Sequence, residues 1–359
     1  MRIGILTYQS ALNYGALYQM YALFTYLSQS YIDCNFEVID YQSPYLQQYY
    51  SVKNQISNNL FSSAVRTFNF LVKRSRFRSF ISGKIQLSSQ SYNIDNIDTA
   101  NATYDLFIAG SDQIWNPCIT DNDLNYYLKF VDSRKRASYA ASIGLAEIPQ
   151  PYLEQIKHEL SMFRTISVRE DASKDYLQTF LSGVSVRSDI DPTLLLKTNE
   201  WEKVIESLPK KKPYVLLFEV KYSYELLSQA VEFAKRRDLD VIYIGPYKKN
   251  SDVKYIPFPH PEHVLSYFRD ASYVFTNSFH GTVFSIIFNK LFYTLAELND
   301  GRNNRITDLL TNLSLTDRMN LHLLESSIDW DSVGNELDLL RERAREYFDG
   351  VINNGRGKN

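Results

Sequence analysis

The fold of this chain is decided by residues 274–283, which have the sequence VFTNSFHGTV. The apolar residues 273–276 predict a buried strand, and residues 283–295 predict a helix that follows a polar turn. His280 and Gly281 lie in that turn. A histidine there could be a satisfied core side chain, but its small polar neighbours leave room for a ligand. Ligands bind at the carboxyl ends of strands in open α/β sheets, and a helix start attracts anions. We therefore expect an anion site with one titratable side chain at this turn.

The same alternation of strands and helices extends over most of the chain in two series. The first series begins with a strand at 2–6, a glycine turn, a helix at 17–28 and a second strand at 36–40. The second series begins with a strand at 214–219, and polar residues around Pro192 separate the two. These series predict an α/β fold with two doubly wound, Rossmann-like domains facing a cleft. We expect the domains at 1–190 and 191–325, with a C-terminal helix and tail at 326–359.

Composition excludes several classes of protein. The 359 residues are 44% hydrophobic and 22% charged, as in ordinary soluble domains, and the net charge of −2 gives no general attraction to nucleic acid. The two cysteines, Cys34 and Cys118, exclude a disulfide scaffold and a cysteine-rich metal site, and no second histidine or carboxylate lies at metal-ligand spacing from His280. The sequence has no apolar run of ~18 residues and no signal-peptide pattern at its start, so we expect a cytoplasmic protein.

Residues 41–94 differ from the rest because they contain no acidic residue. The basic residues of this segment are Lys53, Arg66, Lys73, Arg74, Arg76, Arg78 and Lys84, and phenylalanines are interleaved with them. We expect a basic, aromatic helical insertion at about 45–90 in the first domain. Its charges form a solvated face in one interpretation. In the other, residues 53–84 form a basic amphipathic surface that contacts anionic lipid or a lipid phosphate.

A second polar cluster follows an apolar strand within residues 106–116, LFIAGSDQIWN. Asp112 lies just past the strand end, where a carboxylate can act as an acid or base or orient a sugar hydroxyl. Trp115 could stack on a sugar ring. In the alternative interpretation Asp112 caps the next helix and Trp115 lies in the core. Residues 13–16, NYGA, follow the first strand, and Gly15 would let a ligand approach the backbone, although no dinucleotide-binding fingerprint is present.

Three arginines are candidates for binding an anion. Arg169 follows an expected strand and could hold a phosphate or carboxylate through two hydrogen bonds. The alternative for Arg169 is an ion pair with Glu170 or Asp171. Arg302 and Arg305 could close over an anionic ligand, or lie solvated at the surface.

Five segments together resemble the polysaccharide pyruvyl transferase family. They are 13–16 (NYGA), 110–116 (GSDQIWN), 167–170 (SVRE), 191–196 (DPTLLL) and 278–281 (SFHG), and their order and spacing match over about residues 1–325. The resemblance implies a GT-B-like fold and an enzyme that transfers the carbon skeleton of phosphoenolpyruvate to a sugar as a ketal. The sugar would belong to a bacterial capsular polysaccharide or exopolysaccharide, or to its lipid-linked precursor. The resemblance implies no metal and no cofactor, with phosphoenolpyruvate as the co-substrate.

The resemblance also suggests roles for single residues. The residues expected at the donor site are Arg169, Ser278, Phe279, His280, Gly281, Arg302 and Arg305. His280 is the candidate for donor binding and proton transfer, because imidazole can give or take a proton near neutral pH. Asp112 is the candidate base for the acceptor hydroxyl, and Asp191 is the second choice or holds the domain junction. The residues expected at the acceptor site are Asn13, Tyr14, Gly15, Asp112, Gln113 and Trp115.

Two other functions remain open on the sequence. One is a metal-independent GT-B glycosyltransferase that uses a nucleotide sugar in polysaccharide biosynthesis. The other is a non-catalytic protein that binds carbohydrate or membrane, which the segment 41–94 would suit. For the main hypothesis, the expected partners are phosphoenolpyruvate and a sugar of a lipid-linked oligosaccharide or polysaccharide, and not nucleic acid. Peripheral attachment to the inner face of the membrane through 53–84 is the alternative to a free cytoplasmic location.

Overall fold

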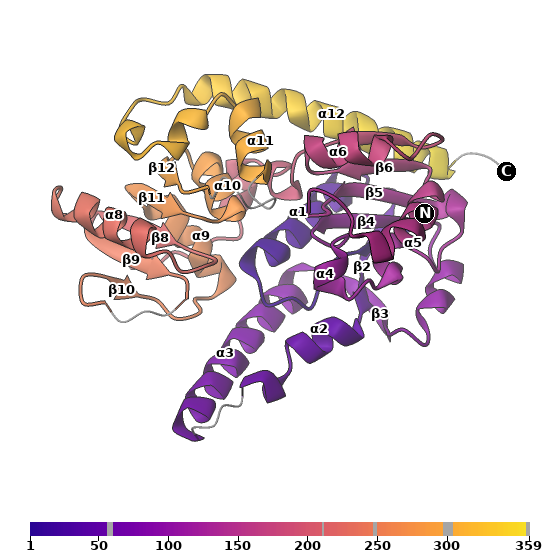
Figure 1. Ribbon diagram of the computed structural model, residues 1–359, viewed down its shortest axis with the longest axis horizontal. Coiled ribbons are helices and arrows are strands. Elements are labelled where there is room, and N and C mark those ends of the chain that lie inside the picture. Colours follow the sequence, from indigo (N-terminus) through magenta and orange to yellow (C-terminus); the bar gives the residue numbers. More distant parts are fainter. Residues whose placement is uncertain (56–59, 210–211, 247–249, 297–303, 357–359) are drawn as a thin grey trace. The chain divides into compact units, whose positions relative to one another are not determined.

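The computed structural model describes residues 1–55, 60–209, 212–246, 250–296 and 304–356 (Figure 1). They form two compact units, each built on its own parallel sheet. Unit 1 comprises Met1–Ser63, Arg78–Leu195 and Asp338–Asn359, and unit 2 comprises Ala64–Phe77 and Leu196–Leu337. The expected pair of Rossmann-like α/β domains is therefore confirmed. The expected cleft stays a prediction.

Unit 1 contains a seven-stranded sheet in the order β3-β2-β1-β4-β5-β6-β7. The strands are β1 (Arg2–Leu6), β2 (Asn35–Tyr41), β3 (Leu87–Tyr92), β4 (Leu106–Asp112), β5 (Arg136–Ala141), β6 (Thr165–Val168) and β7 (Ser185–Ser188). The helices along this part of the chain are α1 (Tyr14–Ser30), α2 (Pro44–Tyr49), α3 (Leu60–Lys84), α4 (Pro117–Thr120), α5 (Gln150–Ser161), α6 (Asp171–Gln178) and the 3-10 helix η5 (Pro192–Leu194). β4 and β5 are buried along almost their whole length, which is typical of parallel strands covered on both faces.

Unit 2 contains a five-stranded sheet in the order β10-β9-β8-β11-β12. The strands are β8 (Tyr214–Phe218), β9 (Asp240–Ile244), β10 (Lys254–Tyr255), β11 (Tyr273–Thr276) and β12 (Leu291–Thr294). The helices are α7 (Thr198–Glu202), α8 (Tyr224–Lys235), α9 (Pro261–Asp270), α10 (Phe279–Ile287), α11 (Asn304–Asn312) and α12 (Trp330–Arg356), which contributes its later part to unit 1.

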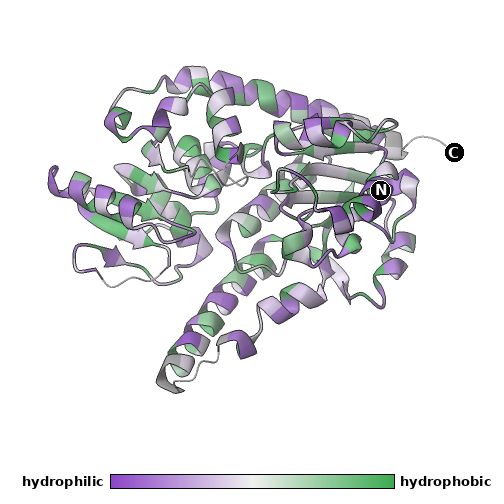
Figure 2. Ribbon diagram, in the orientation of Figure 1, coloured by the Kyte–Doolittle hydropathy of each residue, from purple (hydrophilic) through white to green (hydrophobic). Residues whose placement is uncertain are grey.

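Alternate residues of β8 face different helices, so this sheet is covered on both sides. Val215 and Leu217 share a hydrophobic cluster with the apolar residues of α8. The ring of Phe218 instead lies 5.1 Å from that of Phe268 in α9, between centroids. Figure 2 shows the strands of this sheet as mainly hydrophobic. This two-sided burial explains why the strands have continuous apolar runs instead of alternating ones.

Both sheets place the first strand of the unit in their interior, and the strand order reverses beside it. In unit 1 the chain moves from β1 out to β3 and returns to β4 on the other side of β1. In unit 2 it moves from β8 out to β10 and returns to β11. Ligands of doubly wound sheets bind at the carboxyl ends of the two strands that flank such a switch point. The segments after β1 and β4, and after β8 and β11, are therefore the places to look for a site.

The expected helical insertion at 45–90 is only partly correct. The structure has α2 and α3 in this region, but Leu87–Tyr92 forms the strand β3, which pairs with β2. Its sequence, LSSQSY, lacks the apolar run of the other strands, because an edge strand is hydrogen-bonded on one side only and its surface stays exposed. No helix within the described parts of the chain combines the length and the apolar character needed to cross a membrane.

The division of the chain also differs from the expected one. The sequence placed the boundary after residue 190, whereas the first unit extends to Leu195 and includes η5. The expected separate segment at 326–359 belongs in large part to unit 1, because Asp338–Asn359 packs there. The central part of α3, Ala64–Phe77, packs in unit 2. Such long-range docking of helices is not visible in local periodicity.

The docking of α12 in unit 1 can be tested by removing one buried ring. Phe348 has no exposed surface, and its ring centroid lies 4.4 Å from that of Tyr139 in β5. We expect Phe348→Ala to lower the free energy of unfolding by about 3–5 kcal/mol, measured by urea denaturation. Leu339→Ala, at a position that is 61% exposed in the same helix, should change it by less than about 0.5 kcal/mol. Equal effects of the two substitutions would contradict this packing.

Candidate functional site

A buried ion pair stands at the carboxyl edge of the unit 1 sheet. Arg169 follows β6, and its Nη1 lies 2.8 Å from Oδ2 of Asp191, with the two side chains 2% and 0% exposed. Its Nε also lies 3.4 Å from Oε1 of Glu170. The other oxygen of Asp191, Oδ1, accepts hydrogen bonds from the backbone N–H and the hydroxyl of Thr193 at 2.9 and 2.6 Å. Ser111, within β4, donates to Asp191 Oδ2 at 3.5 Å.

These contacts bear on the expected roles of both residues. Arg169 was predicted either to bind an anion or to form an ion pair with a neighbouring acid. The structure has the ion pair, with Asp191 as well as Glu170. Asp191, the second choice as catalytic base, is buried, paired with Arg169, and caps η5 through Thr193. The place of Arg169 in the donor site stays a prediction.

Asp112 is the carboxylate at the switch point of unit 1 that keeps some exposed surface. It ends β4 with φ of 68°, a left-handed conformation that costs a non-glycine residue about 1–3 kcal/mol. Its Oδ1 accepts from the backbone N–H of Gln113 at 2.8 Å, and its carbonyl accepts from Ser142 at 2.9 Å. Burial raises the pKa of both Tyr8 and Tyr50, and the negative charge of Asp112 contributes to both shifts. Both hydroxyls are therefore within electrostatic range of this carboxylate, and that of Tyr8 donates to the carbonyl of the next residue, Gln113, at 2.6 Å.

Trp115 lies in the core of unit 1 and not at a surface. It has no exposed surface, its ring stacks on that of Tyr127 with centroids 5.6 Å apart, and its Nε1 donates to the carbonyl of Tyr126 at 3.0 Å. The interpretation in which it stacks on a sugar is therefore wrong for this structure, and the core interpretation is correct. Gln113 is also buried, and its side chain packs so closely on Gly144 that a Cβ there would lie 2.6 Å from it.

The turn between β1 and α1 carries the other expected acceptor residues. Asn13 caps α1, since its Oδ1 accepts from the backbone N–H of Ala16 at 3.2 Å. Asn13 is exposed, Tyr14 is half-buried and Gly15 is buried. The ring of Tyr14 stacks on that of Tyr18 one turn later, with centroids 6.2 Å apart. The turn thus presents Asn13 and part of Tyr14 to solvent at the switch point.

Two residues that sequence reasoning missed connect this turn to β4. The hydroxyl of Thr7, which follows β1, donates to the carbonyl of Ser111 at 3.2 Å. Gln19 in α1 donates to that hydroxyl at 2.9 Å. These bonds fix the start of α1 relative to the end of β4. The only signal in the sequence was the position of Thr7 directly after a strand.

The turn that decides the fold has the predicted strand–turn–helix form, with β11 followed by α10. Ser278 caps α10 by accepting from the N–H of Gly281 at 3.2 Å, and its own N–H donates to the Thr276 hydroxyl at 3.0 Å. A Cβ on Gly281 would lie 2.2 Å from that hydroxyl oxygen, so glycine is needed for α10 to pack on β11. The helix expected at 283–295 is misplaced: it starts at Phe279 and ends before Asn289, whose φ is 52°, and β12 follows.

Side chains expected at the donor site meet at the start of α10. Phe279 is buried, His280 is half-buried beside it, and their ring centroids are 5.2 Å apart. Arg305 in α11 brings its guanidinium carbon to 5.6 Å from the centre of the Phe279 ring. Arg302 lies outside the described residues. A helix start, an arginine and a histidine at the end of one strand form an arrangement suited to an anion.

Two further polar residues at this switch point were not predicted. The Asn277 side chain accepts from the N–H of Val220 at 3.1 Å and donates to the carbonyl of Lys221 at 2.6 Å, so it ties the loop after β8 to the start of α10. Glu219 directly follows β8, is buried, and accepts from the N–H of Ser223 at 3.0 Å. Both residues immediately follow apolar strands, which is the signal that could have found them.

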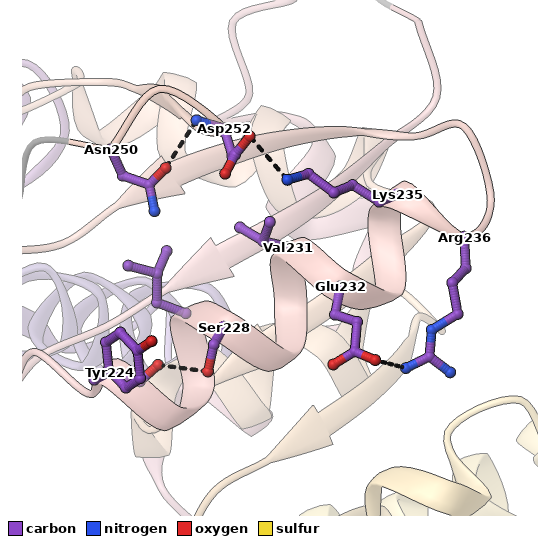
Figure 3. Close-up of a pocket in the computed structure, with 9 residues that line it drawn as sticks. Tyr224, Ser228, Val231, Glu232, Lys235, Arg236, Asn250 and Asp252 are labelled. Atoms are coloured by element: carbon purple, nitrogen blue, oxygen red, sulfur yellow. Dashed lines mark hydrogen bonds and ion pairs between the residues drawn. The ribbon is translucent and has the colours of Figure 1, made fainter.

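A separate pocket of about 570 Å³ lies on unit 2, along one side of α8 (Figure 3). Figure 3 shows Lys235 and Asp252 pointing toward one another, with Nζ and Oδ1 3.0 Å apart. None of the residues expected at the donor or acceptor site lines it. Within the described ranges no group of three or more His, Cys, Asp or Glu side chains could hold a metal. Metal independence stays a prediction.

The comparison with known families can now be set against this geometry. The family model described as polysaccharide pyruvyl transferase matches residues 13–299. The chain belongs to the polysaccharide pyruvyl transferase family. The matched part begins at the cap of α1, includes Asp112, Arg169, Asp191 and the start of α10, and ends at residue 299, before Arg305. A comparison of this chain with curated proteins found no match.

Several solved structures are similar to this chain in fold. The Staphylococcus aureus MnaA–UDP co-structure has a TM-score of 0.53 at 11% identity, covering 100% of this chain and 98% of that one. The Neisseria meningitidis UDP-GlcNAc 2-epimerase bound to UDP-GlcNAc has 0.52 at 10%, covering 96% and 100%. A putative UDP-N-acetylglucosamine 2-epimerase from Listeria monocytogenes has 0.53 at 10%, covering 96% and 97%. At this identity the likeness concerns the fold alone, and it agrees with the expected GT-B-like class.

The buried acid at the end of β8 leads to a pH prediction. Burial raises the pKa of Glu219, so the native state holds this proton more tightly than the unfolded state does. Its stabilising contribution is therefore complete below the unfolded pKa of ~4.3 and is lost as pH rises through the higher native pKa. We expect Glu219→Gln to gain stability relative to the wild type over that pH range, measured by urea denaturation. Glu225→Gln, at an exposed position in α8, should show the same dependence of unfolding free energy on pH as the wild type. If Glu219→Gln also shows the wild-type dependence, the prediction is contradicted.

Proposed function

We propose that this member of the family transfers the carbon skeleton of phosphoenolpyruvate to a sugar as a cyclic ketal. The sugar belongs to a bacterial capsular polysaccharide or exopolysaccharide, or to its lipid-linked precursor. The observation that carries the proposal is the start of α10, where Ser278 caps the helix, His280 is half-buried and Arg305 lies against Phe279. No metal or other cofactor is assigned a role.

The donor fits this place because phosphoenolpyruvate carries a phosphate and a carboxylate. The positive end of the α10 dipole favours one anionic group, and the guanidinium of Arg305 can hold the other through two parallel hydrogen bonds. The buried ring of Phe279 lies against the Arg305 guanidinium and limits the positions that this guanidinium can take. His280, in the first turn of the same helix, is then within the donor site and can transfer a proton.

The reaction can be written with these groups. Imidazolium at His280 protonates the methylene carbon of phosphoenolpyruvate, which makes the neighbouring carbon electrophilic. A sugar hydroxyl attacks that carbon, and its proton passes to the Asp112 carboxylate. A second hydroxyl of the sugar then closes the ketal as the carbon–oxygen bond to phosphate breaks. The proton of the second hydroxyl leaves with phosphate. The proton taken up by Asp112 is released to solvent as His280 takes one up, so both residues regain their starting states.

Asp112 is the proposed base in preference to Asp191. The Asp112 carboxylate keeps exposed surface, whereas Asp191 is buried and paired with Arg169. The strained backbone at Asp112 also supports the choice, because such conformations persist mainly where function requires a particular side-chain direction. Asp191 and Arg169 instead shape the edge of the sheet on which Asp112 stands.

The decisive experiment supplies phosphoenolpyruvate and a panel of lipid-linked sugars to the purified protein. We expect one phosphate released per pyruvyl group added to the sugar, detected by phosphate assay and mass spectrometry. His280→Gln should lower kcat by about 10²- to 10⁴-fold, because it removes the proton donor. His158→Gln, at an exposed position in α5, should leave kcat unchanged. Sugar transfer from a nucleotide sugar without consumption of phosphoenolpyruvate would instead establish the glycosyltransferase alternative.

We further propose that α3 attaches the enzyme to the inner face of the membrane, where a lipid-linked acceptor would be found. Val65, Phe68 and Leu71 are spaced three residues apart on this helix and are exposed, Phe68 by 66%. Arg66 and Arg78 are exposed on the same helix, and Figure 2 shows hydrophobic and hydrophilic residues alternating along it. Exposed apolar side chains beside basic ones, with no acidic residue, suit an anionic lipid surface.

Not every basic residue of the segment is available for such a surface. The Arg76 guanidinium donates to the carbonyl of Phe258 in unit 2. The Lys73 ammonium lies 5.7 Å from the centre of the Phe258 ring, and burial lowers its pKa to about 8. These two cations therefore serve packing within unit 2, and the proposed contact relies on the others.

Vesicle sedimentation tests the membrane contact. We expect the protein to bind vesicles of phosphatidylcholine with 30% phosphatidylglycerol at about 0.1 M salt, and to bind less at about 0.5 M salt because charges are screened. The double variant Phe68→Ser and Leu71→Ser should lose most of this binding. Leu339→Ser, an exposed apolar position outside α3, should retain it. Binding that is equal with pure phosphatidylcholine, or unaffected by the double variant, would exclude this role for α3.

A further inference from the structure

Because Trp115 lies in the core, Tyr14 is the remaining aromatic side chain among the residues expected at the acceptor site. Sugars are commonly held by an aromatic ring that covers their apolar C–H face while polar groups bind the hydroxyls. The structure offers another source of such rings in unit 1. It is the segment after β2, which includes α2, and nothing in its sequence pointed to the site.

Three tyrosines of this segment form a connected surface. The rings of Tyr45 and Tyr49 stack with centroids 6.2 Å apart, and Tyr50 meets Tyr49 edge to face at 4.9 Å. Tyr45 and Tyr50 pack against the core of unit 1, whereas Tyr49 is 59% exposed. We call Tyr45, Tyr49 and Tyr50 the tyrosine surface. An exposed ring that is held rigid by two neighbours can bind a partner with little further loss of conformational entropy.

Tyr50 anchors this surface at the switch point of unit 1. Its hydroxyl is hydrogen-bonded to the backbone of Leu12, the residue before the Asn13 cap of α1. Burial, followed by the neighbouring Tyr49 hydroxyl and the Asp112 carboxylate, raises the pKa of Tyr50. The hydroxyl is thus protonated at neutral pH and lies near the turn after β1 and the end of β4. Those two segments supply most of the residues expected at the acceptor site.

We propose that the tyrosine surface is the platform for the acceptor sugar, with the exposed ring of Tyr49 covering a sugar face and Tyr50 orienting a hydroxyl toward Asp112. This deepens the proposed function and rests on it for the identity of the sugar as the pyruvyl acceptor. The acceptor class is the hexose or N-acetylhexosamine of the proposed function, whose apolar C–H face complements an aromatic ring. Tyr49 and Tyr50 are thus substrate-binding residues.

Kinetics with both substrates distinguish this role from a structural one. We expect Tyr49→Ala to raise KM for the lipid-linked acceptor by about tenfold, with KM for phosphoenolpyruvate unchanged, as loss of one aromatic contact predicts. Tyr49→Trp should restore the wild-type value. Tyr50→Phe keeps the ring and removes the hydroxyl, so it should raise acceptor KM by a smaller factor. Tyr224→Ala, at a tyrosine that is 75% exposed in unit 2, is the matched control and should change neither KM.

A binding measurement separates this inference from the reaction itself. Saturation-transfer NMR with methyl glycosides of glucose, galactose, mannose and N-acetylglucosamine reports sugar contact without phosphoenolpyruvate. If the wild type contacts a glycoside and Tyr49→Ala does not, the platform stands even where no pyruvyl transfer occurs, and the proposed function alone fails. If pyruvyl transfer occurs and Tyr49→Ala changes neither acceptor KM nor glycoside contact, the platform is excluded. Loss of vesicle binding in Tyr49→Ala with sugar binding intact would also exclude it, and assign the ring to the membrane.

Discussion

The buried ion pair between Arg169 and Asp191 is the interaction on which the carboxyl edge of unit 1 depends. Two charges with almost no exposed surface are tolerated only as a pair. Removing one leaves the other buried without compensation, which lowers the free energy of unfolding by about 3–5 kcal/mol. Asp191 also caps η5 through Thr193, and η5 packs against α1. Ser111, near the end of β4, reaches the same carboxylate. One carboxylate thus fixes the helix and the strand ends that surround the switch point.

The polar side chains at the switch points of the two units are hydrogen-bonded in a similar way. Most of these groups pair with one another or with the backbone. Arg169 pairs with Asp191 in unit 1. In unit 2 the Thr276 hydroxyl donates to the carbonyl of Phe218, and the Ser278 hydroxyl accepts from the N–H of Gly281. One titratable group in each remains partly exposed, Asp112 and His280. This arrangement follows from the physics of burial, because most buried polar groups in a folded domain are hydrogen-bonded.

Aromatic side chains show how little the position in the sequence reveals about exposure. The chain contains 27 tyrosines and 21 phenylalanines, and most of those at the unit 1 sheet are buried. Trp115 stands three residues after Asp112, yet its ring turns into the core and stacks on Tyr127. Tyr50 is remote in sequence, yet it lies near the same carboxylate. A short polar helix after β2 is sufficient to bring it there.

Sequence alone determined the α/β class, the two series of strands and helices, the family, and the titratable groups that follow strands. These are local signals: an apolar run, a capping serine, a glycine against a strand. The apolar residues after His280 wrongly predict one long helix, because a buried helix and a buried strand have the same apolar pattern. In the structure the helix ends before Asn289, and β12 follows. Only the tertiary structure decided which charged groups form ion pairs and which aromatic rings pack together. Arg169 meets Asp191 across 22 residues and Ser111 meets Asp191 across 80, and such meetings depend on the order of strands in the sheet, which local periodicity does not contain.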